Sequence, residues 1–169
     1  MDIRFAICTV SDRASSGQRP DRSGPALAAY VTGRGWLATQ KKTVPDDQQL
    51  IAGTLEDWAN TGQVDIILTT GGTGFAPRDV TPEATLSVID REAPGLTEAM
   101  RAAGSARSPH AMLSRARAGI RGTTLIVNLP GSPEAAVESL QSIAEALEHA
   151  VQLLQGSASA EAGHRKGVV

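Results

Sequence analysis

Three short apolar runs, each leading into a polar or glycine-rich turn, constrain the fold of this 169-residue chain most. The runs are IRFAICTV at residues 3–10, VDIILTT at 64–70 and TTLIVNLP at 123–130. Unbroken apolar strands of this length are typical of a sheet that is covered on both faces. Helical patterns lie between and after them, so the chain is predicted to form an α/β sandwich with a largely parallel sheet.

The intervening segments predict further strands and helices. ATQKKTV at 38–44 is expected near the sheet edge because its lysines are exposed. ARAGIRGTT predicts a tight hairpin around Arg121-Gly122. Helices are expected from Ser23, as the N-cap, to about Gly33, from Asp46 to about Gly62 with Leu50, Ile51, Leu55 and Trp58 on one side, from 81 to 91, and from 94 to 104.

A longer helix is predicted from Pro133 to Leu154, because apolar residues recur there every three or four positions. This stripe fits a coiled-coil seam, but a helix that lies on its own sheet explains it more simply. Residues 157–169 are small and polar and are expected to form a disordered tail. No linker divides the rest, so residues 1–156 are expected to form one domain.

Composition excludes several classes of protein. A net charge of -2 argues against a general nucleic-acid binder, and no apolar run approaches the roughly 20 residues that span a bilayer. The single cysteine, Cys8, cannot form an internal disulfide and is expected to be a buried, inert thiol in a cytoplasmic protein. The three histidines show no metal-ligand spacing, which argues against a zinc site.

Two strand-to-helix turns have the composition of phosphate-binding loops. TTGGTGFAPRDVTPEAT at 69–85 contains three glycines that allow close backbone approach, and Thr81 is expected to cap the next helix. NLPGSPEA at 128–135 repeats the arrangement. Because ligands bind beyond the carboxyl ends of parallel strands, the loops after the three strands should share one crevice. The alternative is that these residues only form tight turns. The loop at 69–85 is neither a P-loop nor a dinucleotide fingerprint, since no Gly-Lys follows its glycines and Pro77 stands where the third glycine should be.

Acidic residues near the same loops are candidate metal ligands. Asp79 lies just before a predicted helix, where a carboxylate beside phosphates would need a cation. Asp46 follows a strand and could bind Mg²⁺, although with Gln49 it also fits a capping box. Asp12 is a third candidate or closes an Asx turn. Asp65 is expected to be a solvated loop residue.

The segments SDRASSGQRPDRSGP, VPDD, TTGGTGFAPRDVTPEAT and LSRARAGIRGTTLIVNLPGSPEA together resemble the molybdopterin adenylyltransferase family of molybdenum-cofactor biosynthesis. The resemblance covers nearly all of residues 3–156. It implies a three-layer α/β/α sandwich, usually a homotrimer, that joins molybdopterin to the adenylyl group of Mg²⁺-ATP and releases pyrophosphate. Molybdate insertion would follow on a separate downstream protein or domain.

The resemblance also implies roles for individual residues. Asp46 and Asp79 would be the catalytic aspartates and the ligands of Mg²⁺. The nucleotide-binding residues would be Gly71, Gly72, Thr73, Gly74, Asn128, Pro130 and Gly131. The pterin-binding residues would be Ser11, Asp12, Ser114 and Arg115. Two alternatives are a non-catalytic molybdopterin-binding or scaffold protein of the same fold, and a general nucleotide-binding protein that turns over ATP without a pterin.

Overall fold

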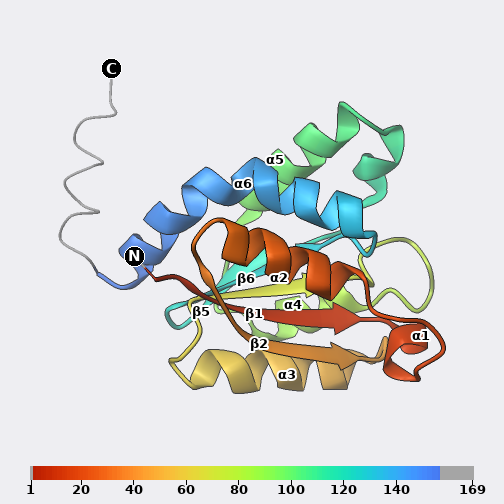
Figure 1. Cartoon of the computed structure of the whole chain (residues 1–169), viewed down its shortest axis with the longest axis horizontal. Coiled ribbons are helices and arrows are strands. Elements are labelled where there is room, and N and C mark those ends of the chain that lie inside the picture. Colours follow the sequence, from red (N-terminus) through yellow and green to blue (C-terminus); the bar gives the residue numbers. More distant parts are fainter. Residues whose placement is uncertain (1, 157–169) are drawn as a thin grey trace.

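A six-stranded sheet with helices on both faces forms the described part of the chain, residues 2–156, in the computed structural model (Figure 1). The strand order is β2-β1-β3-β6-β5-β4. The strands are β1 (Arg4–Val10), β2 (Leu37–Val44), β3 (Ile66–Thr70), β4 (Arg91–Glu92), β5 (Ala118–Arg121) and β6 (Thr124–Leu129). β1, β2, β3 and β6 are parallel, whereas β5 and β4 continue the sheet in antiparallel fashion. The predicted mostly parallel sheet is confirmed.

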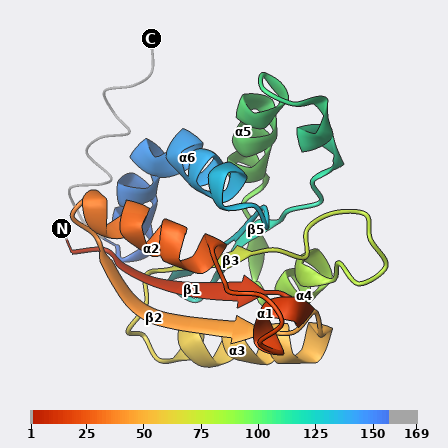
Figure 2. The same ribbon diagram turned by 45° about the vertical axis from the view of Figure 1, so that its right-hand side comes forward.

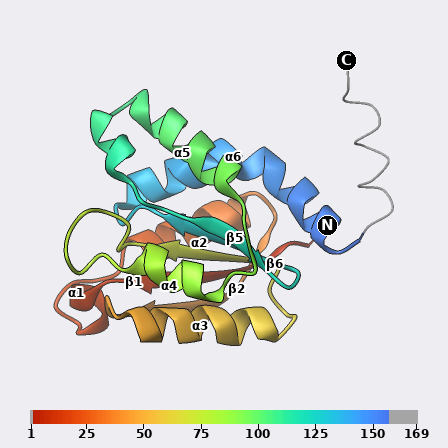
Figure 3. The same cartoon turned by 180° about the vertical axis from the view of Figure 1, so that it is seen from behind.

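Helices cover the sheet in two layers, as expected for a three-layer α/β/α sandwich. α2, α5 and α6 lie on one face, and α3 and α4 lie on the other (Figures 1 and 3). The helices are α1 (Asp12–Ser15), α2 (Ser23–Gly33), α3 (Gln48–Asn60), α4 (Thr81–Val88), α5 (Pro94–Ser105) and α6 (Pro133–Leu154), with a 3₁₀ turn, η1 (Pro109–Leu113). None of the helices in residues 2–156 is long and apolar enough to cross a membrane.

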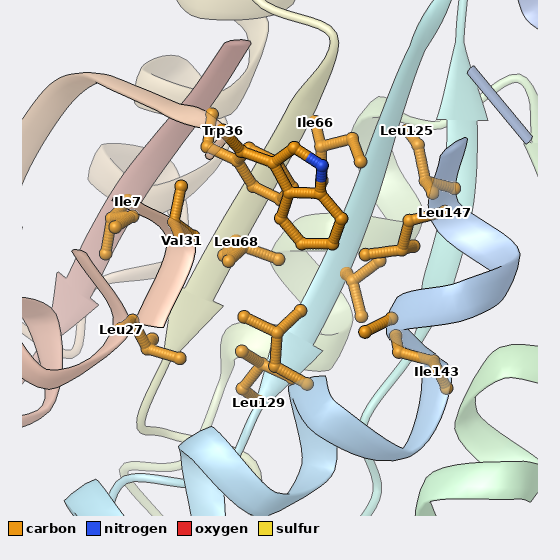
Figure 4. Packing of buried hydrophobic residues seen from close by; sticks show 14 of the residues in the cluster. Ile7, Leu27, Val31, Trp36, Ile66, Leu68, Leu125, Leu129, Ile143 and Leu147 are labelled. Carbon is orange, nitrogen blue, oxygen red and sulfur yellow. The ribbon is translucent and has the colours of Figure 1, made fainter. Parts of the chain in front are cut away.

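The core has two parts because successive side chains of β1 point to opposite faces of the sheet. Phe5 and Ile7 pack with α2 and α6, whereas Cys8 packs with α3 and α4. Trp36 stacks on Phe5 with 5.1 Å between ring centroids, and Figure 4 shows its indole among the aliphatic side chains of Leu68 and its neighbours. Burial raises the pKa of the Cys8 thiol to about 12, so the expectation of a buried thiol is confirmed.

α6 has the predicted bounds, Pro133–Leu154, and its apolar stripe lies on the sheet. Leu140 and Leu147 are fully buried there, so the stripe belongs to the protein's own core. The hairpin between β5 and β6 is also confirmed, with Gly122 in the left-handed region at φ 56°. The predicted tail, residues 157–169, lies outside the described residues.

Several local predictions are wrong. Ser23 is already helical, because the N-cap position of α2 is Arg22, and the carboxylate of the preceding Asp21 accepts a hydrogen bond from Gly24 N at 3.0 Å. Leu50 is 53% exposed, because the buried side of α3 is formed by Ile51 and Leu55 instead. The segments α1, β4 and η1 are too short for periodicity to reveal, and none of them was predicted.

Asp65 is buried, which contradicts its assignment as a solvated loop residue. Asp65 is only 4% exposed. Its carboxylate accepts hydrogen bonds from Arg4 Nε at 3.0 Å and from Gln155 Nε2 at 3.0 Å. Burial raises the pKa of the carboxyl, but the hydrogen bonds and charge of Arg4 outweigh burial, so the net pKa is lowered. Asp65 therefore ties the start of β1 to the end of α6.

Candidate active site

The parallel strands point toward one edge of the sheet, where α1 and the loop between β3 and α4 lie (Figure 2). A cavity of about 730 Å³ opens there. Its wall includes the end of β1, the glycine turn after β3 and the turn before α6. Candidates among its lining residues are Ser11, Asp12, Asp46, Gly71, Gly72, Asp79 and Gly131. The three loops therefore share one crevice, as the sequence predicted.

Asp46 is fixed by a reciprocal pair of hydrogen bonds with Asp12. Asp12 N donates to Asp46 Oδ2 at 2.8 Å, and Asp46 N donates to Asp12 Oδ1 at 3.0 Å. The N-cap of α3 is Asp47, which accepts a hydrogen bond from Leu50 N, so the capping role considered for Asp46 is wrong. Desolvation by burial raises the pKa of Asp46, and the neighbouring charges of Asp12 and Asp79 raise it further. The site therefore favours a cation beside Asp46.

Asp79 faces the same cavity from the opposite loop. Its Oδ2 accepts a hydrogen bond from Ala76 N at 2.9 Å, which fixes the end of the glycine loop. Among residues 2–156, no group of three or more His, Cys, Asp or Glu side chains is arranged to hold a metal ion. Asp46 and Asp79 nevertheless fit Mg²⁺, which is commonly held by one or two carboxylates together with phosphate oxygens and water.

Asp12, which lines the cavity, forms an ion pair with Arg78. Arg78 Nε donates to Asp12 Oδ2 at 2.9 Å, and Arg78 Nη2 donates to Oδ1 at 2.8 Å. This bidentate contact lowers the pKa of Asp12. Because Asp12 also accepts from the Asp46 backbone, it links α1, the start of the α3 segment and the glycine loop.

The glycines are required by packing as well as by ligand approach. Gly71 has φ 103°, and a side chain there would overlap the Val10 carbonyl. Gly72 has φ 65°, and a side chain there would overlap the Thr81 hydroxyl and crowd Asp46. Alanine at either position would therefore displace the residues that shape the cavity.

Free backbone donors line this cavity. Within residues 2–156, the N–H groups of Gly72, Gly131 and Ser132 have no hydrogen-bond acceptor. The N-terminus of α6, capped by Ser132, adds a partial positive charge. Thr81, the first residue of α4, does not line the cavity: it is buried, and its hydroxyl donates to Gly71 O at 2.9 Å. Val80, and not Thr81, is the N-cap of α4.

Arg115 binds the glycine loop through three hydrogen bonds and is not among the residues that line the larger cavity. Its backbone N donates to Thr73 O at 2.8 Å, its Nε to Gly74 O at 2.8 Å and its Nη2 to Asp79 O at 2.7 Å. Its Nη1 pairs with Glu83, whose pKa this hydrogen bond lowers. Thr73, Gly74 and Arg115 are not among the residues that line the larger cavity, so these contacts support a role in positioning the loop, and the direct ligand contacts expected of them stay predictions.

Asn128 is also a structural residue. It is 0% exposed, and its Nδ2 donates to Thr69 Oγ1 at 3.0 Å and Thr85 Oγ1 at 2.8 Å. Its Oδ1 accepts from Arg117 N at 3.0 Å. Every polar group of this side chain therefore has a partner inside the protein, which supports a structural role, and the contact between Asn128 and a nucleotide stays a prediction.

A second, more apolar cavity of about 390 Å³ lies between α5, η1 and α6. Ser114 and Pro130 line it together with Met100 and several alanines. Of the two cavities, Pro130 lines only this one, and its carbonyl accepts a hydrogen bond from Thr70 Oγ1 at 2.6 Å. Ser114 and Pro130 therefore line a different cavity from Asp46 and Asp79.

The sequence reasoning missed Asp21 and three arginines of the segment between β1 and α2. Arg13, Arg19 and Arg22 line the larger cavity beside Asp21. Of this stretch, only Ser11 and Asp12 were assigned to a ligand from the sequence. The recurrence of arginine and aspartate directly after a buried strand was the available signal.

A crevice at the carboxyl ends of parallel strands, with free N–H donors and two carboxylates, is typical of α/β proteins that bind phosphorylated ligands. The particular family follows from comparison with known proteins. The chain belongs to the family described as a probable molybdopterin binding domain, whose model matches residues 6–149.

Relatives of known identity agree with this assignment. Molybdopterin adenylyltransferase of Escherichia coli K12 is 39% identical over 91% of this chain and 86% of its own length. Cinnamon, a molybdenum cofactor synthesis protein of Drosophila melanogaster, is 42% identical, but the match spans only 26% of that longer protein. The crystal structure of the molybdopterin biosynthesis enzyme MoaB from Thermus thermophilus has a TM-score of 0.86 at 46% identity and covers 92% of this chain and 98% of that one.

Proposed function

We infer that this protein is a molybdopterin adenylyltransferase, which transfers the adenylyl group of ATP to molybdopterin and releases pyrophosphate. Its similarity to adenylyltransferases over most of both chains supports this activity. The observation that carries the mechanism is that Asp46 and Asp79, separate in sequence, line one cavity together with free backbone N–H groups.

The difficulty of the reaction is to bring two phosphorylated molecules together, because the phosphate of molybdopterin is already a nucleophile. Positioning and charge neutralisation should therefore provide most of the rate enhancement. The N–H groups of Gly72, Gly131 and Ser132 would hold phosphate oxygens, assisted by the N-terminus of α6. Asp46 and Asp79 would hold Mg²⁺, which would neutralise negative charge on the triphosphate.

The proposed binding residues follow from what lines each cavity. Gly71, Gly72 and Gly131 would contact the nucleotide phosphates, while Ser11 and Asp12 would border the phosphate of the pterin substrate. The pterin rings are proposed to enter the smaller cavity, whose lining includes Ser114 and whose walls are largely apolar. The homotrimer, the cytoplasmic location and a downstream molybdate-inserting partner stay predictions from the family resemblance.

The test is an assay of pyrophosphate release with protein, molybdopterin, ATP and Mg²⁺. Pyrophosphate is expected only when all four are present. Asp79→Asn should lower turnover by at least roughly a hundredfold and leave molybdopterin affinity nearly unchanged, because it removes a charge while keeping the shape. Asp57→Asn, an exposed change on α3, is the matched control and should retain activity.

Two results would contradict the proposal. Wild-type turnover by Asp79→Asn would show that the Asp79 carboxylate is not needed for the reaction. Molybdopterin binding without any pyrophosphate from the unaltered protein would instead indicate a non-catalytic binding or scaffold protein, and ATP turnover without molybdopterin would indicate a general nucleotide hydrolase.

A further inference from the structure

Arg13, Arg19 and Arg22 line the larger cavity, and no group in the described part of the chain pairs with them. Within residues 2–156 their guanidinium groups make no hydrogen bond, ion pair or ring contact. Arg91, on the outermost strand β4, is the one other described arginine of this kind. Unpaired arginines are therefore concentrated at this cavity.

The acidic residues of the same segment are already occupied. Asp12 pairs with Arg78. Asp21 accepts hydrogen bonds from the Thr9 hydroxyl at 2.7 Å and from Gly24 N at 3.0 Å, so it closes the turn before α2. The cationic side chains and the carboxylates of Asp46 and Asp79 thus come from different loops around one cavity.

The backbone that carries these arginines is well fixed. Arg19 N donates to Arg13 O at 3.1 Å, and Ser11 caps α1 by accepting from Ala14 N at 3.2 Å. Gly24 packs so closely against Asp21 and Thr9 that a side chain would overlap them. The arginines are therefore presented from an ordered segment, which lowers the entropy lost when they bind a ligand.

We propose that Arg13, Arg19 and Arg22 form a second phosphate subsite, which binds the phosphomonoester of the pterin substrate. This proposal rests on the proposed function. The triphosphate of ATP is assigned to the carboxylate side with Mg²⁺, so the other phosphate needs cations supplied by the protein. Guanidinium groups suit this role, because they remain charged and donate paired hydrogen bonds to phosphate oxygens.

The subsite has a defined part in the transfer step. One oxygen of the phosphomonoester forms a bond to the α-phosphorus of ATP. The bond from that phosphorus to the bridging oxygen breaks, and its electron pair leaves with pyrophosphate. The arginines hold the other oxygens of the monoester and reduce the repulsion between the two anions, without any oxidation or reduction.

The experiment compares Arg13→Gln and the double variant Arg19→Gln/Arg22→Gln with the wild type, using Arg91→Gln as the matched control. Anaerobic calorimetry measures molybdopterin binding in EDTA without nucleotide, and separately the binding of the ATP analogue AMPCPP with Mg²⁺. Molybdopterin should bind roughly tenfold more weakly for each arginine removed, and AMPCPP affinity should not change. Arg91→Gln should match the wild type in both titrations.

Contrary results are distinct from one another. Weaker AMPCPP binding with unchanged molybdopterin binding would assign the arginines to the nucleotide and overturn the proposal. Unchanged affinities, or an equal loss in Arg91→Gln, would overturn it as well. Unfolding midpoints should stay at the wild-type value, because Arg22 makes no side-chain cap for α2. If instead the proposed function fails, the wild-type protein would release no pyrophosphate, while its arginine variants would still bind molybdopterin more weakly than the wild type.

Discussion

Replacement of Asn128 by alanine tests whether this residue stabilises the fold or binds the nucleotide. The variant removes two hydrogen bonds to buried threonine hydroxyls and one from Arg117 N, all inside the protein. At about 1 kcal/mol for each bond, the free energy of unfolding should fall by about 3 kcal/mol. In a domain of this size, the unfolding midpoint should then fall by roughly 10 °C.

Urea unfolding followed by tryptophan fluorescence measures this loss, and the dependence on urea should keep its slope. Asn60→Ala is the surface control, because Asn60 accepts only one exposed hydrogen bond, from Arg121 Nε at 3.2 Å. Below the unfolding transition, KM for ATP should stay within about twofold of the wild type for Asn128→Ala. A variant of unchanged stability with a strongly raised KM for ATP would refute the reasoning and restore Asn128 as a nucleotide ligand.

Two further predictions concern the loop and the carboxylates. Arg115→Lys loses the paired contacts with the Gly74 and Asp79 carbonyls, so steady-state kinetics should show kcat lowered roughly tenfold with KM for ATP little changed. An unaltered kcat would show that Arg115 does not position the glycine loop for catalysis. The raised pKa of Asp46 means that its ionisation disfavours the folded state, so the stability it contributes is present at low pH and is lost as pH rises through that pKa. Asp46→Asn should therefore raise the unfolding midpoint slightly at pH 7 in EDTA, with no gain near pH 3, while abolishing turnover. A lower midpoint at pH 7 would contradict this sign.

Much of the fold follows from local sequence. The run at residues 3–10 is apolar at successive positions, whereas a strand buried on one face would alternate, so β1 was predicted closely. The apolar residues from Pro133 to Leu154 repeat at the helical period, so α6 was predicted closely as well. Predictions failed where one residue decides the outcome. Asp47 caps α3 in place of Asp46, and Asp21 in place of Ser23 accepts a hydrogen bond from the first turn of α2, because neighbouring polar residues compete for the same backbone donors.

The sequence by itself determined the α/β architecture, the crevice loops and the two carboxylates, because strand periodicity, glycine turns and the position of Asp46 and Asp79 after strands are local features. Only the tertiary structure decided which loop residues face the cavity. Asn128 and Arg115 turn inward to bind other loops, whereas Arg13, Arg19 and Arg22 remain unpaired at its edge. Sequence cannot make this distinction, since a polar side chain is free for a ligand only if no group distant in sequence has already satisfied its hydrogen bonds.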